Sequence, residues 1–528
     1  MRSFVLGMLA LSASPALAED VDGAYDPPFC PLDDPFLSPT EYVQSLSLDL
    51  RGIVPTMEEY AQVEAAGEVP DELIDAWLDS PEFADRVVRM HRDLLWNNVS
   101  TQNLFATNST LNTFGTPPTY LRRNAAAPYR GGVVDCGSFP ATLNNGRFVT
   151  QPHPDQVTFP GATQEGYVDV NPYWAPTTTI RVCGYDAQTR AVSSTGTHCD
   201  GPDGSRDIEC GCGPNLEWCG TNGSNSPNAA ILAGFGEDVE RRIRDVVLED
   251  RPYLDVLTGH DAYVNGPIVN FYRNQAKIPG PVRLSELPVD VDSLPDIPYT
   301  DTSWHRITVP EAHSGVLTSP AFLLRFMTQR ARANRFYNAF LCQPFQPPDA
   351  GIPLGTSGQA TADLTQRDGC KYCHSLLEPA AAHWGRWTPS GAGHLDPLDF
   401  PSFDDECAWC ANTGNSCDAT CKRFYVVDPQ STEQEQFTGW LNAYQFLTPE
   451  QAEGIDRGPS ELVEQTVADG RLPECVAHTA ATKLVGRGLA LDDPDYIDEL
   501  ASELVASGWN YKGMVKAIVT SDEYRRIR

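Results

Sequence analysis

The chain has 528 residues, of which 71 are acidic and 38 basic, and its formal net charge is −33. A surface this acidic repels nucleic acid and anionic lipid, which argues against both as partners. It favours cationic partners or bound divalent cations, and solubility alone is the alternative interpretation. The length allows roughly three or four domains. No apolar run approaches the ~20 residues of a membrane helix, so no membrane span is predicted.

The first 18 residues have the pattern of a secretory signal peptide. Arg2 supplies the positive charge, residues 4–11 form a short apolar core, and Ala16–Ala18 is a small-x-small cleavage site. The mature chain is expected to begin at Glu19 and to be exported to the periplasm, the cell surface or the medium. The 15 cysteines agree with such an oxidising compartment, where disulfides persist.

Changes in composition divide the chain into successive segments. The segments are 1–18 (signal peptide), 19–38 (acidic extended lead), 39–99 (N-terminal helical module), 100–235 (Cys-rich irregular insertion), 236–312 (second helical module), 313–394 (module with a CxxCH motif), 395–430 (second Cys-rich insertion) and 431–528 (C-terminal helical module). This order predicts a mainly α, multi-module helical protein with two Cys-rich irregular insertions.

The helical segments carry amphipathic periods and start signals. Leu46 and Leu50 share one helix face, and Ser80–Pro81 and Ser319–Pro320 each combine an N-cap residue with proline at the first helical position. The insertion at 100–235 shows no long apolar period, and short strands are expected near 167–170 and 178–182. Further helices are predicted at 237–254, 462–467, 475–485, 496–506 and 511–519.

The motif that carries chemistry is formed by Cys370, Cys373 and His374. Covalent haem attachment needs one thiol for each vinyl group and an imidazole beside them for the iron, and CxxCH supplies all three within one turn of chain. We therefore expect a cytochrome c-like segment with one covalent haem c, whose iron His374 binds. The alternatives are a disulfide hairpin beside an incidental histidine, or half of a zinc site.

The remaining haem contacts are less constrained by the sequence. Met514 and His394 are candidates for the second iron ligand, and Met514 on an apolar helix face has core packing as its alternative. Arg386 is a candidate partner for a haem propionate, and Trp387 for packing against the porphyrin, with ordinary core packing as the competing interpretation. A water-bound or empty second position would favour a catalytic or gas-binding haem.

The number of cysteines makes a separate prediction. Removing two haem thiols from 15 leaves 13, an odd number, so one thiol should be unpaired if all the others form disulfides. The first insertion holds six cysteines and should pair internally. The second holds four, for which two disulfides fit an exported protein better than zinc. The cysteines are Cys136, Cys183, Cys199, Cys210, Cys212 and Cys219 in the first insertion, Cys407, Cys410, Cys417 and Cys421 in the second, and Cys30, Cys342 and Cys475 elsewhere.

Acidic residues gather between cysteines of the first insertion. They are Asp200, Asp203, Asp207 and Glu209. Calcium binding is one interpretation, although the spacing is not that of an EF-hand, and a solvated acidic loop is the alternative.

Several segments resemble modules of the planctomycete-type exported cytochrome c proteins, which also occur in myxobacteria-like genomes and are built from domains of unknown function. The segments that carry the resemblance are Leu46–Thr56 and Leu78–Phe83, then Asp250–Tyr253, Leu257–Gly259 and Tyr263–Gly266, then Ser314–Phe322 with Leu341–Cys342, and finally Cys475, Leu484–Arg487 and Ile518–Ser521. Together they cover roughly half of the chain in the order found in the family.

The resemblance implies an exported haem protein whose attachment residues are Cys370, Cys373 and His374. The chain departs from the family after Pro379, where Ala380–His383 is shorter than the Gly- and Phe-containing stretch that the family has there. The two Cys-rich insertions are also not typical of the modules.

Three functions follow from these patterns. The first is electron transfer through covalent haem to or from a redox partner protein or a small-molecule electron carrier. The second is a haem enzyme with an open iron site, such as a peroxidase-like activity. The third is a secreted structural or binding protein in which CxxC is a disulfide and no haem is bound. The motif favours electron transfer over catalysis.

Overall fold

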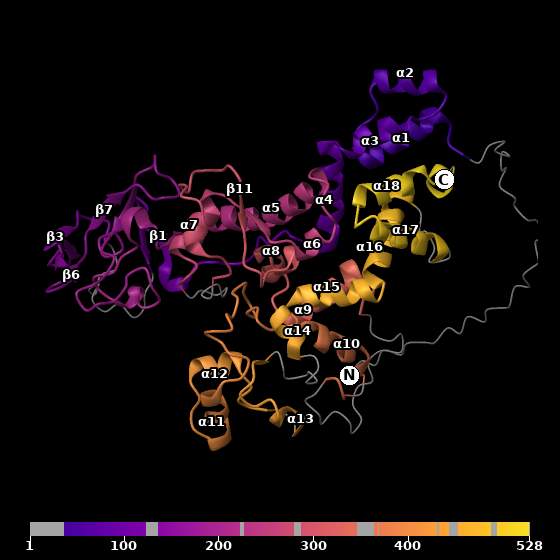
Figure 1. Cartoon of the computed structure of the whole chain (residues 1–528). Coiled ribbons are helices and arrows are strands. Elements are labelled where there is room, and N and C mark those ends of the chain that lie inside the picture. The colour runs from indigo at the N-terminus through magenta and orange to yellow at the C-terminus, as the bar shows by residue number, and fades with distance from the viewer. Residues whose placement is uncertain are drawn as a thin grey trace, which may run out of the picture.

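The computed structural model of the chain describes residues 36–122, 136–221, 226–278, 287–345, 364–367, 369–429, 432–442, 452–486 and 494–526. Helices are the predominant regular structure in the described residues, which confirms the predicted mainly helical character, and a smaller share forms strands (Figure 1). The predicted signal peptide and Cys30 lie outside the described residues. None of the described helices is long and apolar enough to cross a membrane.

The N-terminal helices begin at capping residues that the sequence supplies. They are α1 (Pro39–Leu50), α2 (Met57–Ala66), α3 (Asp71–Leu78) and α4 (Pro81–Leu95). Ser38 and Thr56 each form a capping box with the glutamate three residues later, and Ser80 accepts a hydrogen bond from the backbone N–H of Phe83. These side chains satisfy backbone N–H groups that would otherwise lack a partner in the first turn.

The first Cys-rich insertion contains more regular structure than we predicted. Its strands are β1 (Thr110–Phe114), β2 (Thr119–Arg122), β3 (Thr142–Asn144), β4 (Arg147–Val149), β5 (Gln151–Pro152), β6 (Thr163–Gln164), β7 (Tyr167–Val170), β8 (Ile180–Cys183) and β9 (Gly220–Thr221), and its 3-10 helices include η1 (Thr107–Ser109), η3 (Gly204–Arg206) and η4 (Pro214–Leu216). Five strands form one mixed sheet in the order β7-β8-β2-β1-β9. The two expected strands are confirmed as β7 and β8. The strands β1 and β2 are of similar length and were missed, and the remaining strands of two or three residues are too short to produce a visible period.

The central helices follow this sheet in the chain. The elements are α5 (Pro227–Leu248), α6 (Asp255–Thr258), β10 (Asp261–Val264), α7 (Gly266–Asn274), η5 (Val291–Ser293), β11 (His305–Thr308), η6 (Gly315–Thr318), α8 (Pro320–Arg325), α9 (Gln329–Phe340) and α10 (Lys371–Ala382). The helix predicted at 237–254 was placed wrongly, because α5 begins ten residues earlier and ends at Leu248. Ser226 caps it and Pro227 opens it, a start signal that the glycines at 234 and 236 obscured.

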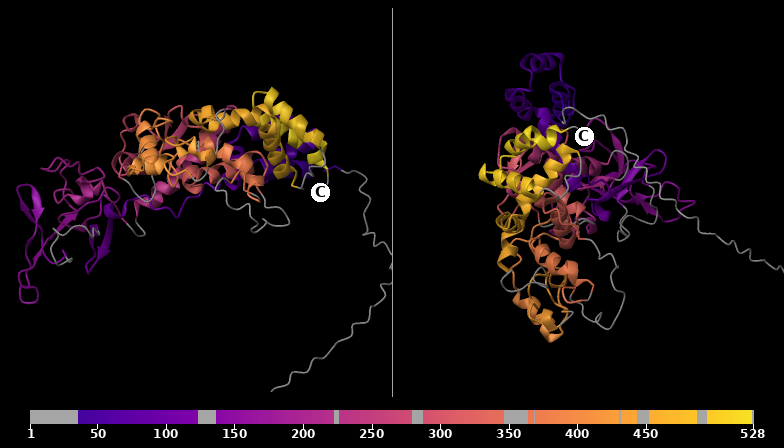
Figure 2. Two further views of the ribbon diagram at one scale, coloured as in Figure 1. Left: turned by 90° about the horizontal axis from the view of Figure 1, so that it is seen from below. Right: turned by 90° about the vertical axis from the view of Figure 1, so that its right-hand side faces the viewer.

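The last part of the chain is helical again. Its helices are α11 (Asp405–Thr413), α12 (Ala419–Phe424), α13 (Thr432–Glu435), α14 (Ala452–Arg457), α15 (Pro459–Ala468), α16 (Arg471–Val485), α17 (Pro494–Ala506), α18 (Tyr511–Thr520) and α19 (Asp522–Arg525). Each of the four helices predicted after residue 460 is present, with starts up to four residues earlier. Figure 2 shows the sheet of the first insertion at one end of an elongated molecule and the C-terminal helices at the other.

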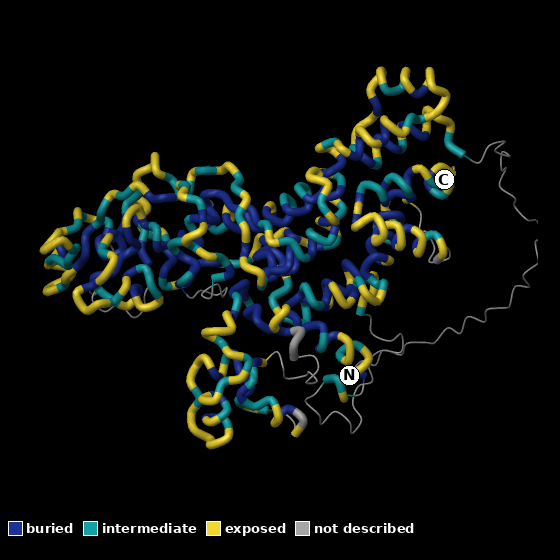
Figure 3. The backbone as a smooth tube through the Cα atoms, viewed as in Figure 1, coloured by how far each residue is buried: buried dark blue, intermediate teal, exposed yellow. Residues whose placement is uncertain are grey.

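One hydrophobic core joins helices from all four helical segments, including α1, α4, α5, α9, α10, α16 and α18. Figure 3 shows this buried interior along α4, α5 and α8, while α2 and α11 are largely exposed. The first and the last described helices meet in it: the Tyr42 hydroxyl donates to the Val519 carbonyl at 2.8 Å, and the Tyr524 hydroxyl donates to Asp49 at 2.8 Å. The second insertion has a small core of its own around its cysteines.

Candidate haem-attachment site

The CxxCH motif forms the start of α10. Cys370 occupies the N-cap position, and the backbone N–H groups of Cys373 and His374 donate to its carbonyl at 3.2 and 3.0 Å. Gly369 precedes it with a φ of +79°, a left-handed conformation that glycine adopts without strain. Residues three and four apart lie on the same helix face. The two thiols and the imidazole therefore share one side of a single turn.

Cys370 and Cys373 differ from the other cysteines that the structure describes, because these two alone are unpaired. Both are half-buried. The other described cysteines form six disulfides: Cys136–Cys183, Cys199–Cys210, Cys212–Cys219, Cys342–Cys475, Cys407–Cys421 and Cys410–Cys417. The pairing within each insertion is as predicted. Cys342 is joined to Cys475. The odd number of cysteines therefore leaves Cys30, which lies outside the described residues, as the one predicted to be unpaired.

The ring of His374 is held from one side by a carboxylate. Its Nδ1 lies 2.5 Å from Oε1 of Glu378, one helical turn further along α10. The side chain of Glu378 is only 4% exposed, and Nε of Arg330 at the start of α9 donates to the same oxygen at 2.6 Å. With Nδ1–H donating to Glu378, the lone pair of Nε2 is free to bind a metal.

The structure does not bring the predicted second ligands next to His374. Met514 is buried in α18, and Figure 1 shows α18 well separated from α10, with α15 and α16 between them. His394 pairs with Trp387 beyond the C-terminal end of α10, whereas His374 lies in the first turn of that helix. A helix rises ~1.5 Å per residue, so about 12 Å separate His374 from Ala382, the last residue of α10.

Trp387 lies in the core between two imidazoles. Its ring centroid is 4.8 Å from that of His313 and 5.0 Å from that of His394. Burial lowers the pKa of His313 to about 3 and that of His394 to about 4, so both rings are neutral at pH 7. The core-packing interpretation of Trp387 has support in these contacts, and its contact with a porphyrin stays a prediction.

The guanidinium of Arg386 forms hydrogen bonds within the protein. It donates to Asp456 at 2.6 Å, to the carbonyls of Leu395 and Phe400 at 3.2 and 2.9 Å, and to the Ser402 hydroxyl at 2.8 Å. These contacts tie the start of the second insertion to the helical body. Pairing of Arg386 with a propionate stays a prediction that none of these contacts supports.

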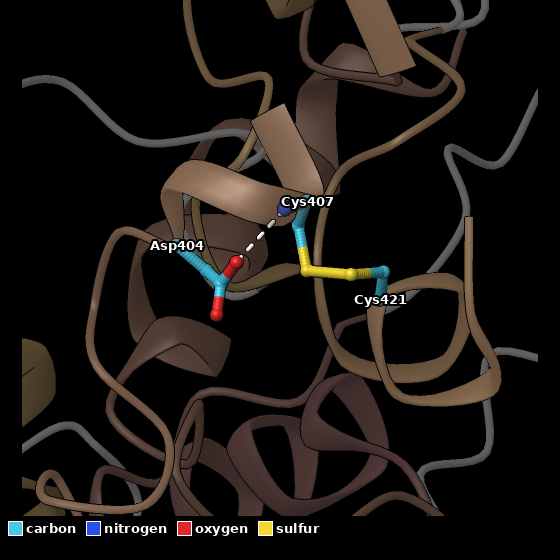
Figure 4. A group of neighbouring side chains, drawn as sticks. All are labelled: Asp404, Cys407 and Cys421. Carbon is cyan, nitrogen blue, oxygen red and sulfur yellow. Dashed lines mark hydrogen bonds between the residues drawn. A yellow bond between two sulfur atoms is a disulfide. The ribbon is translucent and has the colours of Figure 1, made fainter. Parts of the chain in front are cut away.

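A second possible metal group lies in the second insertion (Figure 4). In the described part of the chain, Asp404, Cys407 and Cys421 are the three potential ligands that lie close enough together to share an ion. Cys407 and Cys421 are joined as a disulfide, and Asp404 accepts a hydrogen bond from the backbone N–H of Cys407 at 2.8 Å as the N-cap of α11. This arrangement matches the disulfide interpretation rather than the zinc one.

The acidic residues proposed for calcium are each engaged separately. Lys277 donates to Asp200 at 2.5 Å, while Arg147 and Arg190 donate to Glu209 at 2.9 and 3.1 Å. Asp203 pairs with Arg206, and Asp207 accepts a hydrogen bond from Thr195. The contacts describe a folded acidic loop, and calcium binding stays untested.

A cavity of about 580 Å³ lies between α4 and α5, away from the CxxCH motif. Trp96, Asn97 and Glu240 are among the residues that line it. Trp96 is 50% exposed and has a left-handed φ of 50°, and the guanidinium of Arg335 lies 4.1 Å from its ring centroid.

Sequence reasoning missed the contact of Glu378 with His374. Residues i and i+4 face one another on a helix, but no helix was predicted over 371–382, so the spacing of His374 and Glu378 carried no signal by itself. The contact of Arg330 with Glu378 could not be predicted from the sequence, because α9 and α10 come together only in the folded chain. Comparison with known proteins gave no match to a family model, to a curated protein or to a solved structure.

Proposed function

We propose that the protein is an exported mono-haem c-type cytochrome that transfers electrons through haem bound covalently at Cys370 and Cys373. The observation that carries the proposal is the state of the cysteines. Twelve described cysteines form disulfides, whereas the two of the CxxCH motif keep their thiols beside a histidine on one helix turn. The resemblance of the flanking segments to exported cytochrome c modules agrees with it.

The residues present fit the chemistry of the group. Each thiol adds across one vinyl double bond, with sulfur bonding to one vinyl carbon and the proton going to the other, so that no net electron transfer occurs. His374 would bind the iron through Nε2, because its Nδ1 already contacts Glu378. Haem c bound in this way supplies a one-electron Fe(III)/Fe(II) couple.

Export is part of the proposal. Six disulfides, among them Cys342–Cys475 across 133 positions, fit a chain that folds in an oxidising compartment. The net charge of −33 favours a partner with a basic docking surface. A redox protein with such a surface, or a small electron carrier, would complete the transfer.

The test is maturation of the full chain with a cytochrome c assembly system, followed by a pyridine haemochrome spectrum and a mass measurement. We expect a c-type spectrum and a mass increment of ~616 Da for one covalent haem. The Cys370→Ser/Cys373→Ser variant should lose both signals. A matched control, Cys410→Ser/Cys417→Ser, removes two other cysteines and should keep them.

The outcomes separate the alternatives. A wild-type protein without the mass increment refutes haem attachment and favours the structural or binding protein. Haem that survives in the Cys370→Ser/Cys373→Ser variant refutes attachment at this motif.

A second candidate is a haem enzyme with an open iron site. The observation that favours it is the placement of Met514 and His394, neither of which lies beside His374. Cyanide added to the ferric protein distinguishes the two functions. Rapid binding with a change in the visible spectrum supports the open site, whereas an unchanged six-coordinate spectrum in both oxidation states refutes it.

A further inference from the structure

The carboxylate of Glu378 is buried in the face of α10 that packs on α9. Charged side chains are rarely buried unless they are paired, and that of Glu378 is only 4% exposed. It has two partners, the Arg330 guanidinium at 2.6 Å and Nδ1 of His374 at 2.5 Å. A plain helix-to-helix ion pair would need only the first.

The contact with His374 acts on the ring nitrogen that does not bind iron. A carboxylate at Nδ1 fixes the tautomer, because the proton stays between Nδ1 and Oε1 and leaves Nε2 as the ligand atom. It also fixes the orientation of the ring, since His374 and Glu378 stand one turn apart on the same helix. A ligand whose other N–H donates to a carboxylate is more basic.

We propose that Glu378 is a positioning residue that orients His374 and lowers the reduction potential of the bound haem, with Arg330 holding the carboxylate in place. The inference rests on the proposed function. A more basic imidazole donates more electron density to iron and stabilises Fe(III) relative to Fe(II), so the potential falls. Hydrogen bonding around the axial ligand is one of the means by which proteins set haem potentials.

The experiment compares the wild type with Glu378→Gln and Glu378→Asp, all as full-length protein with haem attached. At a fixed applied potential the reduced-to-oxidised ratio of Glu378→Gln should rise at least tenfold, which is 59 mV for a one-electron couple. Glu378→Asp keeps the charge but shortens the side chain, so its ratio should rise less, in the same direction. The proton NMR shifts of the His374 imidazole in the ferric protein should move in both variants.

Asp238→Asn is the matched control. Asp238 forms a buried i, i+4 ion pair with Arg242 in α5, with 2.8 Å between the charged atoms. Its loss should lower stability without moving the haem potential or the His374 signals.

The outcomes keep the inference apart from the proposed function. Absence of covalent haem in the wild type refutes the proposed function. Haem attached with an unchanged potential in Glu378→Gln overturns the inference alone. A higher potential in Glu378→Gln with unchanged potential and His374 signals in Glu378→Asp overturns it as well, because the carboxylate would then act only through its charge. If Glu378→Gln yields no loaded protein, the potential and His374 signals of Glu378→Asp decide by themselves.

Discussion

The disulfide between Cys342 and Cys475 should be the covalent link that contributes most to stability. Cys342 follows α9 and Cys475 lies in α16, so the bond closes a loop that contains the CxxCH motif and the whole second insertion. The cost of closing a loop in the unfolded chain grows with the logarithm of its length. A disulfide removes this conformational entropy from the unfolded chain, and for a separation of 133 positions the resulting stabilisation of the folded state is about 5 kcal/mol. The same relation gives at most about 2.4 kcal/mol for Cys410–Cys417, whose separation is 7.

We therefore expect Cys342→Ser/Cys475→Ala to lower the free energy of unfolding by roughly 2.6 kcal/mol more than Cys410→Ser/Cys417→Ser does. The assay is urea unfolding under non-reducing conditions, followed by tryptophan fluorescence, with all proteins in the same haem state. Trp384 lies within the long loop and is fully buried, so its fluorescence reports on the unfolding of this part of the chain. An equal or smaller loss in the long-loop variant would refute the loop-closure reasoning.

Three further predictions concern buried or capping side chains. Burial lowers the pKa of His91 to about 4 and that of His313 to about 3, against 6.5 when unfolded. Burial lowers the pKa of His394 to about 4 as well. The stability that these three neutral histidines contribute is complete well above pH 6.5 and falls as the unfolded state takes up protons, by about 2 kcal/mol for each at pH 5. His313→Gln should therefore remove about one third of their combined loss between pH 7 and pH 5 in urea titrations. Arg332 is fully buried and donates only to backbone carbonyls, so Arg332→Met should cost about 3 kcal/mol in the same assay, and a loss below 1 kcal/mol would contradict it. Asp404→Ala removes the N-cap of α11 and should lower the free energy of unfolding by about 1 kcal/mol. The zinc content of the purified protein should not change, and bound zinc that is lost with Asp404 would disprove the disulfide interpretation.

The parts of the fold that sequence reasoning predicted are those with local causes. Ser38, Thr56 and Ser80 cap helices because their side chains reach N–H groups three residues away, and that spacing is visible in the sequence. The pairing of cysteines within each insertion followed from number and compartment. The start of α5 was missed because its glycines break the apolar period, although Ser226–Pro227 carried the signal.

The parts that could not be predicted depend on distant segments. The five-stranded sheet joins β1 to β9 across about a hundred positions through two residue pairs, too few to leave a pattern in either strand. At the candidate site, Cys370, Cys373 and His374 lie close together in the sequence and could be singled out as a motif. Arg330 could not, because it reaches Glu378 only where α9 packs on α10. The hydrogen bonds of Arg386 to the carbonyls of Leu395 and Phe400 could not be predicted either, because they depend on how the second insertion folds back, and its pairing with a propionate stays a prediction.

The packing of α1 against α18 and α19 in one core has a consequence for the order of folding. A chain that emerges N-terminus first, from a ribosome or through a membrane, presents α1 long before Val519 and Tyr524 exist to receive Tyr42 and Asp49. Contacts this distant in sequence slow folding, because a long loop must close before they form. The core of α1 stays incomplete until nearly the last residue has appeared.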